Sequence, residues 1–321
     1  MSDLVVFHKQ LGDTALLEPV LRKLAHATGR PVDLICPPHL APLVELMPHT
    51  RLAAGRRRWL PDRVWAYDWG GRTTRAAALT FCRERHLLIP NPDWVGLRHR
   101  LVFQHIQARS YLDRHVSRYF WDETPVPEKE VAFSHLRLER PPQTWAGTCW
   151  KDEPYVLLNP VSAWKRKSYD VVKWARVLAH ARELGLPRIV MTGGTDAWQQ
   201  EHCAEITAAA RAEGVTVEDV SGLTSLREFM HMVSRAAMVL CIDGAAAHLA
   251  RGFGVPCLTI FGPSHRWMWH EKDDLNLALD ATEFCSDQRP GAAHIPIEQI
   301  NAGIERLISS SEAGRLLTPK N

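Results

Sequence analysis

Short apolar runs alternate with longer amphipathic segments along most of the chain. Residues 4–7 form the first apolar run, a Gly-Asp turn follows at 12–13, and apolar positions at helical spacing predict a helix over 14–28. Residues 31–36 and 39–46 then predict a second strand and a short helix. A strand–helix–strand rhythm of this kind is typical of a parallel sheet covered by helices on both faces.

This rhythm is interrupted twice before it resumes. Residues 55–135 are rich in Arg and Trp and lack a clear period, although 99–116 have helical spacing. Residues 138–154 carry Pro, Gly and Thr without periodicity, which indicates a linker or a loop at its edge. Because 321 residues exceed one ordinary hydrophobic core, we expect two domains, residues 1–145 and 146–321.

The second half repeats strand and helix in close succession. Strands are expected at 155–159, 188–192, 216–219, 237–242 and 257–261, and helices at 170–184, 198–213, 225–234, 246–253 and 297–309. The sequence therefore predicts an α/β protein of two doubly wound, Rossmann-like parallel-sheet units in tandem, with a ligand bound between them.

Positive charge is concentrated in the first half of the chain, although the formal net charge is only +3. Residues 51–118 contain fourteen Arg. Such a surface suits a polyanion, namely a phosphorylated glycolipid, an anionic membrane or a nucleic acid, and a solvated basic face without a partner explains it equally well. Because non-specific DNA binding needs a more concentrated basic footprint, a nucleic-acid partner is not expected.

Several site classes and compartments are disfavoured by the sequence. Seven Cys at wide spacing without a CxxC motif argue against a disulfide framework and a Cys-rich zinc site. The His residues lack ligand spacing, and no metal or cofactor is expected. The first ten residues lack the features of a signal peptide, and no window approaches ~18 apolar residues. We expect a cytoplasmic protein whose membrane contact, if any, is peripheral and on the cytoplasmic face of the inner membrane.

The turn after the strand at 237–242 has the composition of an anion-binding site. Asp243, Gly244 and Ala245 lead into the next helix, and small residues let a ligand approach the backbone closely. Amides at a helix N-terminus attract anions, and the His248 ring could add a hydrogen-bond donor. Tight packing of the helix on the sheet explains the same residues without a ligand, with His248 as an ordinary helix histidine.

Residues 221–264 resemble the C-terminal signature of glycosyltransferase family 9, whose best-known members are the heptosyltransferases. The matching residues are Gly222, Ser225, Leu226, Glu228, Asp243, His248, Leu249, Ala250, Gly254, Pro256 and residues 261–264. The chain departs from the pattern at Gly244-Ala245, where the family has a hydroxyl residue and then Gly, so one side-chain contact to a phosphate would be lost. The resemblance implies a GT-B fold with two facing Rossmann-like domains.

Two further segments are similar to that family. Residues 8–24 resemble its opening, and the resemblance implies that Asp13 is the general base of the reaction; helix N-capping is the alternative for an Asp after Gly. Residues 159–174 resemble a segment in which Lys167 would neutralise the departing diphosphate; a solvated basic loop is the alternative.

The same resemblance extends to further substrate contacts. The Gly193-Gly194 loop is expected near the nucleoside, where Asp196 would accept from the ribose hydroxyls or else cap the next helix. The donor-binding residues are predicted to be Gly12, Ser162, Thr192, Gly193, Asp196, Thr224, Asp243, Gly244, Ala245 and His248. The acceptor-binding residues are predicted to be Arg56, Arg57 and Arg72.

The resulting hypothesis is an inverting, metal-independent glycosyltransferase. It would move a sugar, heptose from ADP-heptose being the first choice, onto a lipopolysaccharide core or another anionic glycolipid or glycan. Residues 1–145 would bind the acceptor and residues 146–321 the nucleotide sugar. Two alternatives stay open: a sugar-nucleotide epimerase of the same fold, for which the sequence offers no additional acid/base residues, and a non-catalytic protein that binds nucleotide sugars or polyanions.

Overall fold

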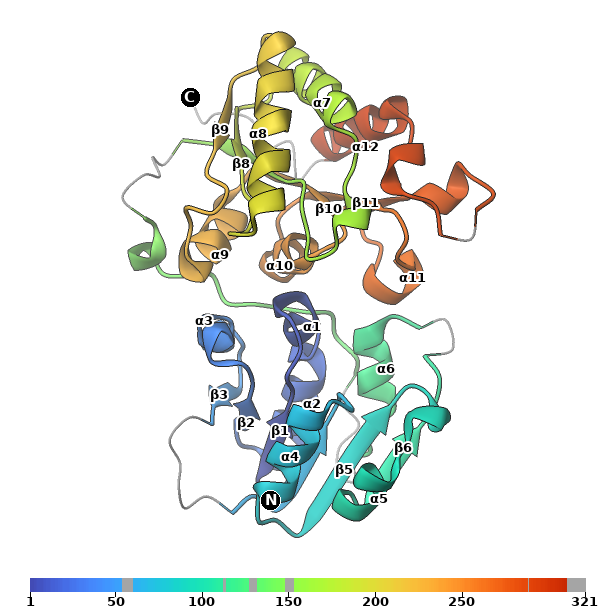
Figure 1. Cartoon of the computed structure of the whole chain (residues 1–321). Helices are drawn as coiled ribbons and strands as arrows, with labels where there is room; N and C mark the ends of the chain where they lie inside the picture. Colours follow the sequence, from blue (N-terminus) through green and yellow to red (C-terminus); the bar gives the residue numbers. More distant parts are fainter. Residues whose placement is uncertain (54–59, 112–113, 127–131, 148–152, 288, 311–321) are drawn as a thin grey trace. The chain divides into compact units, whose positions relative to one another are not determined.

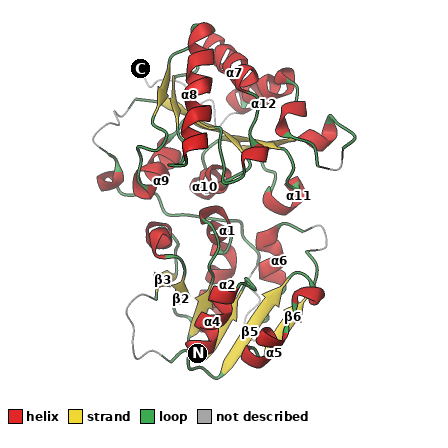
Figure 2. Cartoon of the chain, in the orientation of Figure 1, coloured by secondary structure: helices red, strands yellow, loops and turns green. Residues whose placement is uncertain are grey.

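The computed structural model describes residues 1–53, 60–111, 114–126, 132–147, 153–287 and 289–310. The chain divides into two compact units, Met1–Glu139 and Arg140–Asn321. Each unit consists of a parallel sheet with helices packed against it (Figures 1 and 2).

The N-terminal unit contains a parallel sheet in the order β3-β2-β1-β4-β5-β6. Its strands are β1 (Asp3–Val6), β2 (Val32–Ile35), β3 (Thr50–Leu52), β4 (Arg63–Ala66), β5 (Glu84–Ile89) and β6 (His105–Ala108). Its helices are α1 (Leu11–Ala15), α2 (Glu18–Thr28), α3 (Ala41–Glu45), α4 (Gly71–Leu79), α5 (Leu97–Val102) and α6 (Val116–Asp122).

The C-terminal unit repeats this order with its own strands, as β12-β11-β10-β7-β8-β9. The strands are β7 (Tyr155–Asn159), β8 (Arg188–Met191), β9 (Val217–Asp219), β10 (Met238–Ile242), β11 (Cys257–Phe261) and β12 (Asn276–Asp280). The helices are α7 (Val171–Glu183), α8 (Ala197–Ala212), α9 (Leu226–Arg235), α10 (Ala245–Phe253), α11 (Arg266–Trp269) and α12 (Ile297–Ser309). Both orders are those of doubly wound Rossmann-like sheets, so the predicted fold class is confirmed.

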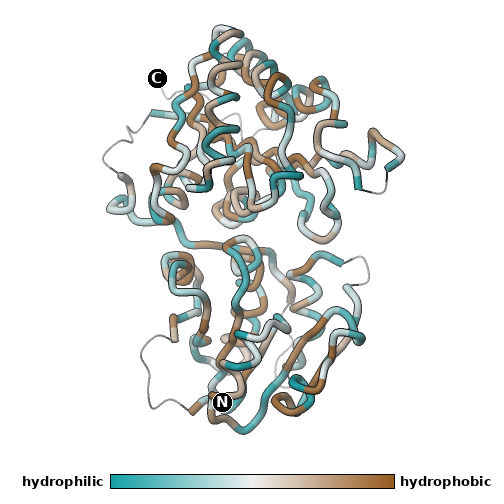
Figure 3. Tube along the Cα trace, viewed as in Figure 1, coloured by the Kyte–Doolittle hydropathy of each residue, from teal (hydrophilic) through white to brown (hydrophobic). Residues whose placement is uncertain are grey.

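The core of each unit lies along its central strands. Every residue of β1, β4, β7, β10 and β11 is buried, as expected for parallel strands that helices cover on both faces. The hydrophobic colour in Figure 3 accordingly follows the central strands. Two charged residues in these strands are paired, since Arg63 donates to both carboxylate oxygens of Asp3 at 2.8 Å.

The single helix predicted over residues 14–28 is wrong. The structure has two helices there, α1 and α2, and the second begins at Glu18. Pro19 is in the first turn of α2 and has no N–H to donate to the carbonyl of Ala15, which prevents one continuous helix. Gly12 and Asp13 therefore lie inside α1 rather than in a turn before a helix.

The helix predicted over residues 99–116 is also wrong. Helix α5 ends at Val102, and α6 begins only at Val116. Between them, β6 pairs with β5 in the register His86↔His105, so long-range strand pairing overrides the local helical spacing. The sequence pattern also predicts no strand at β3, β4, β5 or β12. Strand β3 has only three residues, and charged or polar residues at the ends of the other three disguise short buried runs.

No helix among the described residues combines the length and apolar character that crossing a bilayer requires.

Gly262, directly after β11, is a position where packing requires glycine. A Cβ there would lie 2.7 Å from the backbone nitrogen of Ala292, in the short 3₁₀ helix η6 (Ala292–His294). Because neither backbone can easily move, Gly262→Ala should destabilise the protein by about 1–3 kcal/mol. Urea unfolding of the variant checks this value.

Gly291→Ala is the matched control for that substitution, because a Cβ at Gly291 meets nothing within 4 Å. Its unfolding midpoint should stay close to that of the parent chain. Equal destabilisation by both substitutions would contradict the packing argument.

Candidate functional site

The shared strand order fixes where each unit can bind a ligand. In open α/β sheets, ligands bind outside the carboxyl ends of the strands, where the strand order reverses. This point lies between β1 and β4 in the N-terminal unit and between β7 and β10 in the C-terminal unit. The loops that follow these strands therefore form one candidate site in each unit.

A largely buried ion pair lies at the reversal point of the C-terminal unit. Asp243 follows β10, and its carboxylate accepts hydrogen bonds from Lys167 Nζ and Ser264 Oγ, both at 2.5 Å. Lys167 ends the 3₁₀ helix η4 (Lys165–Lys167) beyond β7, whereas Ser264 comes after β11. The side chains of Lys167 and Asp243 are only 15% and 4% exposed. One carboxylate thus joins the loops of three adjacent strands.

The N-terminus of α10 begins beside this pair. Gly244 occupies the N-cap position in an extended conformation, and among the described residues no side chain caps the first amides of the helix. A Cβ on Gly244 would lie 3.5 Å from that of Ser162, so the loops after β7 and β10 are close neighbours. Amides without a side-chain cap, next to a lysine, form the arrangement that binds anions such as phosphate.

His248 is buried on α10 and is 7% exposed. Burial lowers its pKa to about 4, against the opposing effect of Asp243, while Lys167 and Arg251 lower it further. The imidazole is therefore neutral at pH 7. It can donate one N–H to a ligand but adds no positive charge to the site of the C-terminal unit.

Gln199, on α8, holds the loops after β7 and β8 together. Its Oε1 accepts from the Gly194 amide at 2.7 Å, and its Nε2 donates to the Ser162 carbonyl at 3.1 Å and to Asp196 at 3.3 Å. Asp196 stands at the N-cap position of α8, but its carboxylate does not cap the helix. The capping alternative for Asp196 is therefore not realised.

Three other predicted donor residues lie in the loops after β8 and β9. Thr192 is 1% exposed, and its hydroxyl accepts from Asn159 Nδ2 at 3.0 Å, so its side chain secures β7 to β8. A Cβ on Gly193 would lie 3.0 Å from that of Ser221, so a side chain at this position would be crowded. Thr224 is partly buried and precedes Ser225, the N-cap of α9.

Asp68 organises the reversal point of the N-terminal unit. Its carboxylate, just beyond β4, accepts from the amides of His8 at 2.9 Å and Gly70 at 2.7 Å, and from the hydroxyl of Thr73. The Nδ1 atom of His8 lies 3.0 Å from the same Thr73 hydroxyl. These bonds tie the loop after β1 to the first turn of α4.

Asp13 is partly buried within α1, directly beyond the loop after β1. It is not an N-cap, because Gln10 occupies that position. Burial, with a contribution from the Asp13 carboxylate, raises the pKa of Tyr111 to about 12. The two side chains therefore interact near the carboxyl ends of β1 and β6, which is where a ligand of this sheet would bind.

The family model for glycosyltransferase family 9 (heptosyltransferase) matches residues 94–291, which is more than half of the chain. The chain belongs to glycosyltransferase family 9. This confirms the resemblance drawn from the sequence motifs.

Individual relatives are distant. Lipopolysaccharide heptosyltransferase 3 of Escherichia coli is 24% identical over 173 residues, which are 51% of this chain and 49% of that protein, so the match spans about half of the relative. The solved E. coli ADP-heptose lps heptosyltransferase II has a TM-score of 0.79 at 14% identity, covering 97% of this chain and 100% of the other. E. coli heptosyltransferase WaaC with ADP-2-deoxy-2-fluoro heptose has a TM-score of 0.67 at 15% identity, covering 95% and 99%. These structures establish a shared fold.

The structure describes only one of the three predicted acceptor-binding residues. Arg72 is exposed in the first turn of α4, and its charge is one of the influences that lower the pKa of His8, after burial. Arg56 and Arg57 lie outside the described residues. Lys9 was not predicted, yet its Nζ lies 4.7 Å from the ring centre of Trp69 beside the same reversal point.

Much of the Arg-rich region is neutralised within the unit. Several of its guanidinium groups pair with carboxylates rather than adding unbalanced charge to the surface. These pairs are Arg51–Asp33, Arg63–Asp3, Arg83–Asp62, Arg109–Glu123, Arg114–Glu123, Arg114–Asp122 and Arg118–Asp122. A uniformly basic face is therefore a poor description of residues 51–118.

The Lys167–Asp243 pair should contribute measurably to stability. Asp243→Asn keeps the size of the side chain but leaves the largely buried ammonium group without its counter-charge. Because the lysine retains some exposure, we expect a loss of about 2–3 kcal/mol in unfolding free energy at pH 7. Urea denaturation measures it, and Asp196→Asn, at an exposed carboxylate, should change little. A loss of similar size in both variants would contradict the assigned role of the pair.

Acid should destabilise the protein partly through His248. Its folded pKa of about 4 lies below the ordinary value of 6.5, so the unfolded chain binds the extra proton between these values. Stability is full above about pH 6.5 and falls toward pH 4, by on the order of 3 kcal/mol for this group. His248→Gln should lose less stability than the parent chain between pH 7 and pH 4.5.

Two further histidine variants calibrate the acid experiment. His270 also has a pKa lowered to about 4, mainly by burial, so His270→Gln should reduce the acid sensitivity to a similar degree. His265 is exposed, and His265→Gln should leave the acid sensitivity unchanged. An undiminished acid loss in His248→Gln would refute the role of that buried ring.

Proposed function

We propose that this chain transfers a sugar from a nucleotide-diphosphate donor, heptose from ADP-heptose being the favoured case, to a lipopolysaccharide core or related surface glycan. The reaction would invert the anomeric carbon and need no metal ion. Family membership supports the reaction class, and the solved relatives named for ADP-heptose or containing its analogue support the donor.

The observation that carries the proposal is the placement of Lys167 beside the N-terminus of α10. Both lie at the reversal point of a doubly wound sheet, where nucleotide phosphates bind in this type of fold. As the sugar leaves, negative charge grows on the diphosphate. A fixed ammonium group and helix amides stabilise that charge without reorganising during the step.

Asp243 has a positioning role in this scheme. Its carboxylate would repel a diphosphate if it were free, but Lys167 and Ser264 both donate to it. The pair fixes the lysine at the end of β10, and the ammonium group has further N–H donors for a phosphate oxygen. The neutral His248 ring would supply one more donor.

The acceptor chemistry is assigned to the N-terminal unit. Direct inversion requires one base to take the proton from the attacking hydroxyl, and we assign this role to Asp13. A well-placed base contributes about 10²–10⁴-fold to the rate. Arg72, in the first turn of α4, and Lys9, in the loop after β1, lie beside the same reversal point and would attract a phosphorylated acceptor, which the chain would meet at the cytoplasmic face of the inner membrane.

The base assignment is tested by Asp13→Asn. We expect ADP release from ADP-heptose in the presence of acceptor to slow by about 10²–10⁴-fold, while ADP binding measured by calorimetry stays within twofold. Asp93→Asn, an exposed carboxylate of the same unit, is the control and should keep full turnover. Unchanged turnover in Asp13→Asn would remove that residue from the mechanism.

The donor assignment is tested by nucleotide binding. ADP should raise the melting temperature more than UDP or GDP at equal concentration, since binding stabilises the native state by RT ln(1 + [L]/Kd). Lys167→Met should abolish most of the ADP shift. The absence of any nucleotide-dependent shift in the parent chain would refute the proposed function.

A further inference from the structure

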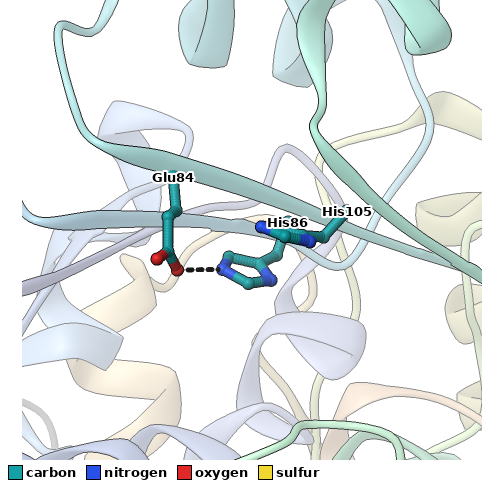
Figure 4. Close-up of side chains that lie close together, drawn as sticks. All are labelled: Glu84, His86 and His105. Carbon is teal, nitrogen blue, oxygen red and sulfur yellow. Dashed lines mark hydrogen bonds and ion pairs between the residues drawn. The ribbon is translucent and has the colours of Figure 1, made fainter.

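Three potential metal ligands meet on one face of the N-terminal sheet. Glu84 and His86 are two residues apart on β5, so their side chains point to the same side, and His105 lies opposite His86 on β6 (Figure 4). One ligand atom from each of the three lies within 4.8 Å of the others. None of these residues belongs to the candidate site at the carboxyl ends of the strands.

The cluster is held in place by its neighbours. The imidazole of His86 is stacked between two rings, with Trp65 of β4 at 4.0 Å and His105 at 4.5 Å between ring centres. Its Nε2 atom also lies 3.1 Å from a carboxylate oxygen of Glu84. A ring fixed in this way has its ligand atom already directed at the carboxylate.

We infer that Glu84, His86 and His105 form a binding site for a divalent transition-metal ion, of which Zn²⁺ is the best match. Two imidazoles and one carboxylate are a ligand set that zinc uses in proteins, with the fourth position left for water or another ligand. Bonds of about 2.1 Å in tetrahedral geometry place neighbouring ligand atoms about 3.4 Å apart. The Glu84–His86 separation of 3.1 Å is close to this value, and the ligand atom of His105 lies within 4.8 Å of both.

An ion can reach the cluster from solvent. The side chain of Glu84 is 50% exposed, whereas that of His86 is 15% exposed. A cavity of about 390 Å³ borders both histidines and is completed by Tyr67 and Thr124. It leaves room for a water molecule or a small anion as the fourth ligand.

The position of the cluster indicates what the ion would do. Glu84 and His105 begin β5 and β6, so the cluster lies at the opposite end of the strands from Asp13 and Asp68. Strand β6 is an edge strand of the sheet. An ion bound to both strands would secure this edge and stabilise the N-terminal unit without taking part in sugar transfer.

The spacing of these residues along the chain does not indicate a metal site. Glu84 and His86 are separated by one residue, a spacing common in strands, and the third ligand is nineteen positions further along. Only the pairing of β5 with β6 brings it alongside. The inference is independent of the proposed transfer reaction.

Isothermal titration of the untagged, EDTA-treated full chain with Zn²⁺ tests the inference. We expect one high-affinity ion per chain and a rise in melting temperature with Zn²⁺. His105→Ala and the isosteric Glu84→Gln should each weaken binding at least tenfold. Because both side chains are largely exposed, these variants should fold normally, and nucleotide binding should be unaffected.

A second cluster supplies the matched control. Cys285, Asp287 and His294 in the C-terminal unit also bring ligand atoms within 4.8 Å of one another. His294→Ala removes any ion that this second cluster holds, so binding at Glu84, His86 and His105 is measured in that background. If the inference is right, His294→Ala still binds one ion, and Co²⁺ bound to it shows visible d–d bands that the added substitution His105→Ala removes. Binding that survives in both His105→Ala and Glu84→Gln, or the absence of binding in the parent chain, would overturn it.

Discussion

The ion pair between Lys167 and Asp243 is the interaction on which the candidate site of the C-terminal unit depends. A carboxylate at the centre of a phosphate site would be unfavourable on its own, because it repels the ligand and costs desolvation energy. Here the Asp243 carboxylate accepts hydrogen bonds from Lys167, in the loop after β7, and from Ser264, in the loop after β11. Asp243 therefore fixes the lysine and holds two neighbouring loops together, and its negative charge is balanced by the lysine.

The N-terminal unit uses an aspartate at the corresponding place for a different purpose. Asp68 follows β4 as Asp243 follows β10, and the two sheets have the same strand order. Asp68, however, is bound to backbone amides and a threonine hydroxyl rather than to a cation. The same strand order thus holds a hydrogen-bonded loop at this position in the N-terminal unit and a fixed lysine in the C-terminal unit. This difference agrees with assigning the diphosphate to the C-terminal unit.

The elements that can be predicted from the sequence are those with long apolar runs uninterrupted by polar residues. Strands β7, β10 and β11 are nearly continuous apolar runs, which the sequence pattern predicts as strands, and the apolar spacing of α12 likewise predicts a helix. Helical spacing predicts a helix where the edge strand β6 lies, because that strand depends on pairing with residues nineteen positions earlier, which spacing along the chain cannot reveal. The break between α1 and α2 was missed, although Pro19 signals it.

The candidate site was predictable where a motif carried it. Similarity to family 9 indicates Lys167, Asp243 and His248, and the structure places Lys167 and Asp243 at one reversal point. Gln199 escaped notice because a glutamine inside a helix has no motif, and only its three hydrogen bonds reveal what it does. The neutrality of His248 was equally hidden, since it arises from burial and not from neighbours in the sequence.

The chain passes only once from one compact unit to the other, between Glu139 and Arg140. All strands of the first sheet are supplied before residue 109, so this sheet is complete in the nascent chain while the second is still being synthesised. Domains made of one continuous segment generally fold as units, the N-terminal one first. The first sheet can therefore form before the strands of the second have been synthesised, which limits the chance that strands of the two sheets pair with each other.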